Sequence, residues 1–152
     1  MGNIIDGKQL SLRLKGEMAE EVKALEMKYG RVPSLAVILV GENPASQSYV
    51  RGKIKAAGEV GIKSELITMP ADTTEETLLA EIERLNADEL TDGVLVQLPL
   101  PKHIDEERVI DAIAFEKDVD GFHPANVANL WLGKPCIVPC TPKGVMQMIA
   151  EC

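Results

Sequence analysis

Aromatic residues are nearly missing from this chain of 152 residues. It has two phenylalanines, two tyrosines and one tryptophan, or 3% of the total, so a buried core has to be built from aliphatic side chains and methionine. No apolar run approaches the roughly 18 residues that a membrane-spanning helix needs. The amino terminus also lacks the basic start and the apolar stretch of a signal peptide. These absences indicate a globular protein of the cytoplasm.

Positive charge is scarce and scattered. Sixteen Lys and Arg stand against 24 Asp and Glu, which gives a net charge of −8. Because no basic cluster offers the face that nucleic-acid phosphates require, we expect no nucleic-acid partner. Cysteine is rare as well. Cys136, Cys140 and Cys152 are odd in number and lack the second ligand pair of a zinc site, so we interpret them as free thiols and expect no metal.

Apolar strands and amphipathic helices alternate along the rest of the chain. The run 34–40 is apolar without alternation, which is typical of a strand covered on both faces. The order of elements predicts an α/β fold of three layers, an open and mostly parallel sheet with helices on both faces. The patterns predict strands over residues 34–40, 62–69 and 93–98, helices over residues 8–29, 45–60, 74–86 (capped by Thr73 or Thr74), 105–114 and 143–151, and a loop-rich stretch over residues 117–142.

One lysine interrupts the apolar side of the predicted helix 45–60. At about 100° per residue, Lys53 falls on the same arc as Val50 and Ala57 and is the only charge there, with Tyr49 one turn before it. Burial disfavours an ammonium ion, so a lysine in this place is a candidate general acid or base. The phasing alone favours another interpretation, in which the stem crosses apolar surface and the amine reaches solvent. Both interpretations stay open at this point.

Polar side chains follow the third predicted strand and the fourth predicted helix. Gln97 comes directly after the buried stretch 94–96, and its amide can orient a lysine or a substrate carbonyl, or satisfy loop backbone groups. Asp118 and Asp120 would face the same way in an extended segment. Such a pair can share a proton, hold a metal or accept N–H donors from a flat heterocycle, and it can also form a turn before Gly121. Ligands of open parallel sheets bind beyond the carboxyl ends of strands, which favours these segments and the turn after β-strand residues 34–40.

Four stretches of the chain, in this order, resemble one family. Residues 40–62 read VGENPASQSYVRGKIKAAGEVGI, and residues 92–101 read DGVLVQLPLP. Residues 117–127 read KDVDGFHPANV, and residues 139–144 read PCTPKG. These stretches are similar to segments of the bifunctional methylenetetrahydrofolate dehydrogenase/cyclohydrolase (FolD) family. The resemblance implies that the chain is the N-terminal catalytic domain of such an enzyme.

The resemblance also implies a function. The family oxidises methylenetetrahydrofolate with NADP, or NAD in some members, and hydrolyses the methenyl product to formyltetrahydrofolate. It implies that Lys53 is the general acid/base at the one-carbon bridge, that Tyr49 stacks on or positions the folate ring, and that Gln97 forms a hydrogen bond with Lys53. Asp120 would bind the amino and ring N–H groups of the pterin. The substrate-binding residues that the resemblance implies are Tyr49, Gln97, Leu98, Pro99 and Asp120.

One part of the family pattern is not found in these residues. Members continue into a dinucleotide-binding domain with glycine-rich phosphate loops, and no G-x-G-x-x-G occurs here. We expect a folate-binding catalytic domain over residues 1–141 and, over residues 142–152, the start of a helix leading to a NAD(P)-binding domain. NADP is therefore expected to bind outside this truncated chain, which the resemblance implies is a homodimer. The alternatives are a non-catalytic folate-binding fragment and an unrelated lysine enzyme that forms a Schiff base with a carbonyl substrate.

Overall fold

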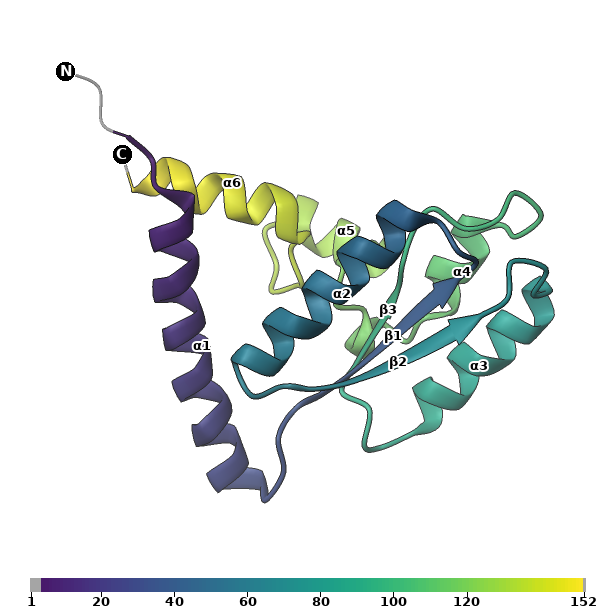
Figure 1. The fold of residues 1–152 in the computed structure, drawn as a ribbon, viewed down its shortest axis with the longest axis horizontal. Helices are drawn as coiled ribbons and strands as arrows, with labels where there is room; N and C mark the ends of the chain where they lie inside the picture. Colours follow the sequence, from purple (N-terminus) through teal and green to yellow (C-terminus); the bar gives the residue numbers. More distant parts are fainter. Residues whose placement is uncertain (1–3, 152) are drawn as a thin grey trace.

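β1 (Ser34–Val40) is the central strand of a three-stranded parallel sheet with the order β2-β1-β3 (Figure 1). Its neighbours are β2 (Lys63–Met69) and β3 (Gly93–Val96). The computed structural model describes residues 4–151. Five of the seven residues of β1 are buried, as the continuous apolar run predicts, because helices cover both faces of the strand.

The helices form a layer on each side of the sheet (Figure 1). α2 (Pro44–Glu59) packs on one face, and α3 (Glu75–Ala87) and α4 (Glu106–Ala112) pack on the other. The predicted three-layer α/β fold is therefore confirmed. The remaining helical segments are α1 (Gly7–Tyr29), the 3-10 turn Phe115–Lys117, α5 (Pro124–Trp131) and α6 (Cys140–Ala150).

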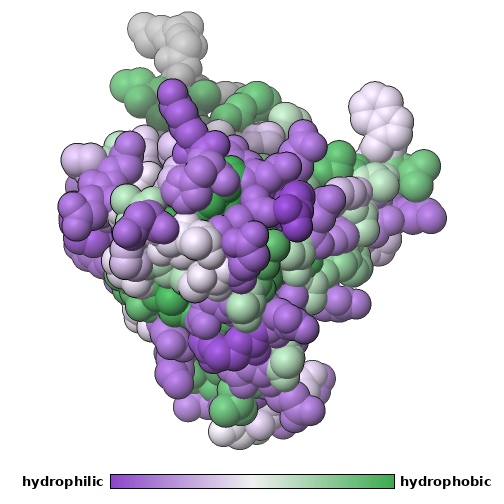
Figure 2. Space-filling view, turned by 90° about the vertical axis from the view of Figure 1, so that its right-hand side faces the viewer, coloured by the Kyte–Doolittle hydropathy of each residue, from purple (hydrophilic) through white to green (hydrophobic). Residues whose placement is uncertain are grey.

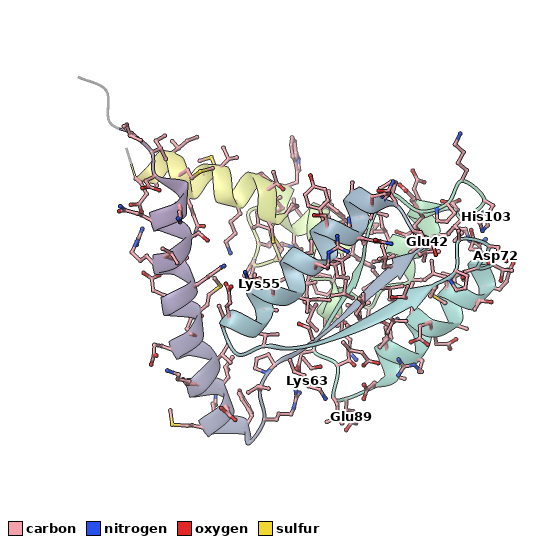
Figure 3. The ribbon with its side chains drawn as sticks, in the orientation of Figure 1. Glu42, Lys55, Lys63, Asp72, Glu89 and His103 are labelled. Carbon is pink, nitrogen blue, oxygen red and sulfur yellow. The ribbon has the colours of Figure 1, made fainter. Side chains whose placement is uncertain are left out.

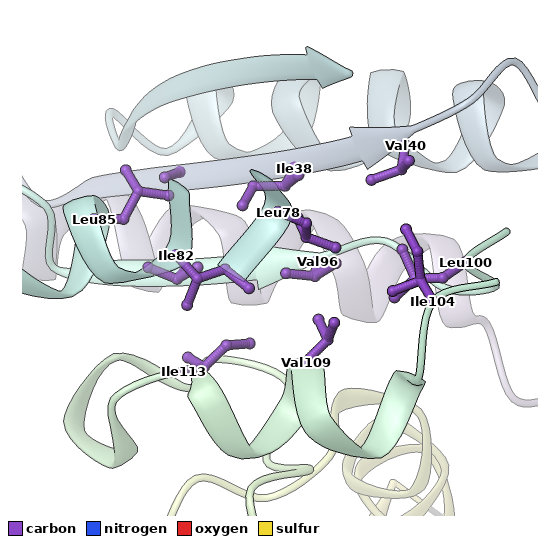
Figure 4. Close-up of a cluster of buried hydrophobic side chains, with 12 residues drawn as sticks. Ile38, Val40, Leu78, Ile82, Leu85, Val96, Leu100, Ile104, Val109 and Ile113 are labelled. Carbon is purple, nitrogen blue, oxygen red and sulfur yellow. The ribbon is translucent and has the colours of Figure 1, made fainter. Parts of the chain in front are cut away.

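The larger core lies between the sheet and the helices α3 and α4 (Figure 4). Ile38 in β1 lies opposite Ile67 in β2 and Val96 in β3. Because successive residues of a strand point to opposite faces, β1 supplies alternate side chains to two cores. From α3 and α4 the larger core takes Leu78, Ile82, Leu85, Val109 and Ile113. The smaller core, under α2, contains Val37, Leu39, Val50 and Leu95.

Short polar residues cap the first four α-helices, and glycine ends the first one. Asp6 caps α1, and the side chain of Thr74 accepts a hydrogen bond from the backbone N–H of Thr77 at the start of α3. Thr74, and not Thr73, is therefore the cap of that helix. Gly30 ends α1 with a φ of 71°, a left-handed conformation that glycine adopts without strain.

The structure differs from the prediction between residues 117 and 142. This stretch is not loop-rich, because it contains α5, whose first position is Pro124 and whose N-terminus is capped by the side chain of His123. α6 begins at Cys140, earlier than expected, since Pro142 in a first turn has no N–H that the helix would need. The domain boundary expected after residue 141 thus falls inside α6.

The surface at the carboxyl ends of the strands is mainly polar. β1 and β2 point to the right in Figure 1, and the view from that side shows hydrophilic side chains over most of the face, with apolar patches between them (Figure 2). Glu42, Asp72 and His103 lie together at this end, in the loops that follow the three strands (Figure 3). Among the described residues, no helix is long and apolar enough to cross a membrane.

Candidate folate site

A cavity of about 990 Å³ lies beside β3. It extends from the carboxyl end of the strand, at Gln97 and Leu98, to its amino end, at Asp92 and Gly93. β3 is an edge strand of the sheet, and Val94 forms an isolated bridge with Asp118. The other walls of the cavity include Ser34 and Leu35 of β1, Lys53 and Ala56 of α2, Ile62, the segment with Val119, Asp120 and Phe122, and residues 139–142 at the start of α6.

This position corrects part of the expectation drawn from the strand ends. The turn between β1 and α2 is not among the walls of the cavity, and the cavity runs back along the whole of β3. Four of the residues named from the sequence do meet there although they are far apart in the chain. They are Lys53, Gln97, Leu98 and Asp120.

Two other residues named from the sequence lie outside this cavity. Tyr49 is 68% exposed on α2, one turn before Lys53. Pro99 is also exposed, directly after Leu98. Neither side chain lines the cavity, and their roles in binding folate stay predictions.

α2 holds Lys53 at the wall of the cavity. Val50 and Ala57 are buried on the same side of the helix, which confirms the phasing predicted from the sequence, and Lys53 itself is half-buried. The helix begins at Asn43, whose side chain accepts hydrogen bonds from the N–H groups of Ala45 and Ser46. Lys53 therefore has an apolar base and a head that faces the cavity, with no ion pair among the described residues.

Gln97 has one satisfied and one unsatisfied side-chain group. β3 ends at Val96, earlier than expected, but the N–H of Gln97 still donates to the carbonyl of Ile38 at 2.9 Å. Its Nε2 donates to the carbonyl of Leu98 at 2.6 Å, whereas its buried Oε1 has no hydrogen-bond partner among the described residues. The expected hydrogen bond to Lys53 is thus not formed. A buried acceptor without a partner costs about 1–3 kcal/mol.

The carboxylate of Asp118 is part of the structural framework. Asp118 is 3% exposed and accepts hydrogen bonds from the N–H groups of Asp120, Gly121 and His123. It accepts a fourth from Asn126 Nδ2 at 2.8 Å. The turn before Gly121, one of the alternatives considered for the pair, is therefore confirmed for Asp118.

Asp120 differs from Asp118 in that its carboxylate lines the cavity and accepts no hydrogen bond from the described residues. Burial raises the pKa of this carboxyl above its ordinary value of 3.8. The positive charge of Lys53 opposes the rise, and the negative charge of Asp118 adds to it. A half-buried carboxylate without a partner is suited to accept N–H donors from a ligand.

Several residues around the cavity were not singled out from the sequence. Asn126 is the most buried of them, at 1% exposure, and it was missed because the stretch containing α5 was taken for a loop. The His123-Pro124 pair is a helix-start signal that could have located α5. The cavity residues that the sequence did not single out include Ala56, Val119, Phe122 and Thr141.

The described residues offer no metal site, and the start of α2 offers no nucleotide-phosphate site. Within residues 4–151 no three His, Cys, Asp or Glu side chains are grouped so as to hold a metal ion. The start of α2 follows a central parallel strand, where dinucleotide-binding folds hold phosphate. Here the side chain of Asn43 occupies the first N–H groups of that helix. The start of α2 therefore does not fit the phosphates of NADP.

Comparison with known proteins agrees with this geometry. A sequence profile described as "Tetrahydrofolate dehydrogenase/cyclohydrolase, catalytic domain" matches residues 5–120. The bifunctional protein FolD of Listeria innocua is 56% identical over 149 residues, which is 98% of this chain and 52% of the relative. The chain thus spans about half the length of the curated relatives it matches.

Solved structures show the same fold over the whole chain. The methylenetetrahydrofolate dehydrogenase of Bombyx mori is 46% identical with a TM-score of 0.96, and the match covers 99% of this chain and 52% of that one. The dehydrogenase-cyclohydrolase (FolD) of Trypanosoma brucei, solved with NADP cofactor and an inhibitor, is 40% identical with a TM-score of 0.93, and the match covers 98% of this chain and 51% of that one. The chain belongs to the tetrahydrofolate dehydrogenase/cyclohydrolase family and contains its catalytic domain.

Proposed function

We propose that this chain binds a tetrahydrofolate derivative in the cavity beside β3. In this proposal it supplies the folate-binding, catalytic half of a methylenetetrahydrofolate dehydrogenase/methenyltetrahydrofolate cyclohydrolase. The observation that carries the proposal is the meeting of Lys53, Gln97 and Asp120 at one cavity from three separate segments. The volume of about 990 Å³ lies within the range of small-molecule sites, roughly 300–1,000 Å³.

The pterin ring matches the polar groups of this cavity. Its amino group and neighbouring ring N–H form a flat edge of donors, and the carboxylate of Asp120 is a half-buried acceptor without a partner among the described residues. A ligand that donates to this carboxylate removes the cost of leaving it unpaired. This match supports a pterin rather than an anionic ligand.

Lys53 is the proposed general acid/base. Hydrolysis adds water to the methenyl carbon, which bridges two nitrogens, and releases one proton. One carbon–nitrogen bond then breaks, so the carbon leaves as a formyl group on the other nitrogen. The amine of Lys53 accepts one proton of the attacking water and returns it to the nitrogen that leaves. The second proton of that water is released as the carbon–oxygen double bond of the formyl group forms.

NADP is the proposed redox partner of the whole enzyme, but not of these residues alone. NADP would accept a hydride from the methylene carbon when it is bound. The Trypanosoma brucei relative was solved with NADP, whereas the start of α2 in this chain does not fit its phosphates. We therefore assign NADP, with NAD as the other choice, to a domain beyond residues 1–141. Incubation of this chain with methylenetetrahydrofolate and NADP is expected to give no NADPH absorbance.

The test of the proposal is hydrolysis of methenyltetrahydrofolate, followed by the loss of its absorbance. Lys53→Met should lower the chain-dependent rate by about 10²-fold or more, the usual contribution of an acid/base group. Lys55→Met is the matched control, because Lys55 lies on the same helix with 80% of its side chain exposed (Figure 3). Equal rates in the two variants would refute the role of Lys53.

The same preparations separate the alternatives. A non-catalytic folate-binding fragment would bind folinate, a stable formylated tetrahydrofolate, but show no hydrolysis above the rate without protein. An enzyme that forms a Schiff base would be modified at Lys53 by borohydride and a carbonyl compound, which mass spectrometry detects. Modification at Lys53, with no binding of folinate, would replace the proposal by that alternative.

The proposal extends to assembly and location. We propose a homodimer in the cytoplasm, without nucleic-acid partners. The net charge of −8 argues against binding to phosphate backbones. α5 presents an exposed apolar surface, with Trp131 91% exposed, of the kind that interfaces cover. Sedimentation velocity of the chain at several concentrations tests the dimer, and a single monomeric species at all of them would contradict it.

A further inference from the structure

Asn126 connects two walls of the cavity without lining it. Its side chain is buried in α5, at 1% exposure. The Nδ2 group donates to Asp118 Oδ2 at 2.8 Å, and the Oδ1 accepts from the N–H of Ile137 at 3.1 Å. Both ends of one amide are therefore satisfied, each by a different segment of the chain.

The first of these segments carries Asp120. The backbone of Asp118 bridges Val94 in β3, and its carboxylate accepts from the N–H groups of Asp120 and Gly121 at 3.2 and 3.0 Å. This fixes the turn from which the Asp120 side chain extends beside the carboxyl end of β3. Asn126 donates to the same carboxylate, so it holds the acceptor in place for the turn.

The second segment leads into α6. Ile137 is followed by Pro139, which begins the wall formed by residues 139–142. The turn at Gly121 lies directly against this segment, since a Cβ on Gly121 would be 2.6 Å from the carbonyl oxygen of Ile137. The Asn126 amide is therefore placed where a change in its contacts alters the spacing between Asp120 and the start of α6.

We infer that Asn126 is a positioning residue of the folate cavity, acting through Asp118 to set the place of the Asp120 carboxylate. That the ligand is a folate rests on the proposed function. The geometric part of the inference rests on the hydrogen bonds alone, because the Asn126 side chain supplies one of the four hydrogen bonds of the Asp118 carboxylate and the partner of the Ile137 N–H. Loss of the amide leaves the Asp118 carboxylate with the three N–H donors of its own turn, and it leaves the Ile137 N–H without its acceptor.

The test is a double-mutant cycle on folinate binding, measured by calorimetry. Asn126→Ala and Asp120→Asn are each expected to raise the dissociation constant by about tenfold. If Asn126 acts through Asp120, the substitution Asn126→Ala should change the constant much less in the Asp120→Asn background. Asn129→Ala is the matched control, because Asn129 lies on the same helix and its side chain forms no hydrogen bond within residues 4–151.

The number of sites per chain separates positioning from loss of structure. A fraction of chains that is irreversibly unfolded lowers the number of sites and leaves the constant unchanged, whereas a displaced Asp120 keeps one site per chain and raises the constant. Reversible unfolding also raises the apparent constant, but it would speed hydrogen exchange in every helix. Hydrogen exchange gives a readout without ligand: in Asn126→Ala the amides of Gly121 and Ile137 should exchange faster together, while those of α3 should not change.

The outcomes of these experiments distinguish the positioning role of Asn126, the binding mode at Asp120 and folate binding itself. Additive effects of the two substitutions, or unchanged exchange at both amides, would overturn the positioning role and leave folate binding intact. If Asp120→Asn leaves the constant for folinate unchanged, the proposed binding mode fails. If the parent chain binds no folinate, both the proposed function and the inference that rests on it are overturned.

Discussion

Asp118 and Asp120 are two positions apart, and their carboxylates have opposite surroundings. Asp118 accepts four hydrogen bonds from its own turn and from α5. Asp120 accepts none from the described residues and faces the cavity. Asp118 thus stabilises the turn, and Asp120 is available to bind a ligand. The ionised carboxylate of Asp120 destabilises the folded chain, because it is partly buried and has no hydrogen-bond donors.

Replacement of Asp120 by asparagine should raise the free energy of unfolding, because it removes this partly buried charge. Burial raises the pKa of Asp120 above 3.8, so the folded chain holds this proton more tightly than the unfolded chain does. The protonated Asp120 carboxyl therefore stabilises the folded chain. This stabilisation is fully present below the pKa that Asp120 has in the unfolded chain, and it is lost as the pH rises through the pKa that Asp120 has in the folded chain. Near neutral pH, Asp120→Asn should therefore require more urea to unfold than the parent, and the difference should disappear below pH 3.8.

Asp72→Asn controls for the charge change in this experiment. Asp72 is an exposed aspartate in the loop after β2 (Figure 3). Its substitution is expected to leave the unfolding midpoint close to that of the parent. A midpoint for Asp120→Asn that stays below the parent's at neutral pH would contradict the assigned cause.

A side chain at Gly121 should disrupt the contact between the two walls. Gly121 has a φ of 72°, and its added Cβ would meet a backbone oxygen at 2.6 Å. Gly133 has a similar φ of 65°, with no atom within 4 Å of an added Cβ. Both alanine variants bear the left-handed strain of about 1–2 kcal/mol. Gly121→Ala should lose about 1–3 kcal/mol more in urea unfolding, and equal losses would show that the close contact is unimportant.

The features that could be predicted from the sequence are those that depend on residues close together in the chain. The run 34–40 lacks alternation, and this local fact was enough to predict that β1 belongs to a sheet covered on both faces. The phasing of α2 placed Lys53 beside Val50 and Ala57 for the same reason, since helical geometry relates residues one turn apart. These predictions required no knowledge of which segments meet.

The features that the sequence did not predict depend on contacts between distant segments. Asp118 and Asp120 look alike in the sequence, and only the donors from Asn126 and from the turn separate their roles. The cavity lies along β3 between α2, the segment with Val119 and Asp120, and the start of α6, and strand and helix patterns do not reveal that these segments meet. The unpaired Oε1 of Gln97 likewise follows from how the loop at Leu98 folds.

Lys117, directly before the turn at Asp118, connects that turn to the end of α3. It precedes Asp118, and its Nζ donates to the carbonyls of Leu85, Asn86 and Asp88 at 2.7–2.8 Å. These carbonyls lie at the end of α3, where the helix dipole is negative and the last carbonyls lack partners within the helix. A half-buried ammonium group there joins α3 to the segment that leads to the cavity.

Methionine has a side chain of similar length to lysine but no ammonium group. Lys117→Met should therefore destabilise the folded chain. The expected loss is about 1–3 kcal/mol in the free energy of unfolding, the cost of leaving such carbonyls unpaired. Lys102→Met, at an exposed position in the loop after β3, should change it by less than about 0.5 kcal/mol. Urea unfolding followed by circular dichroism measures both. If the two variants unfold at the same urea concentration, Lys117 contributes no more than a surface lysine, and its three hydrogen bonds do not stabilise the end of α3.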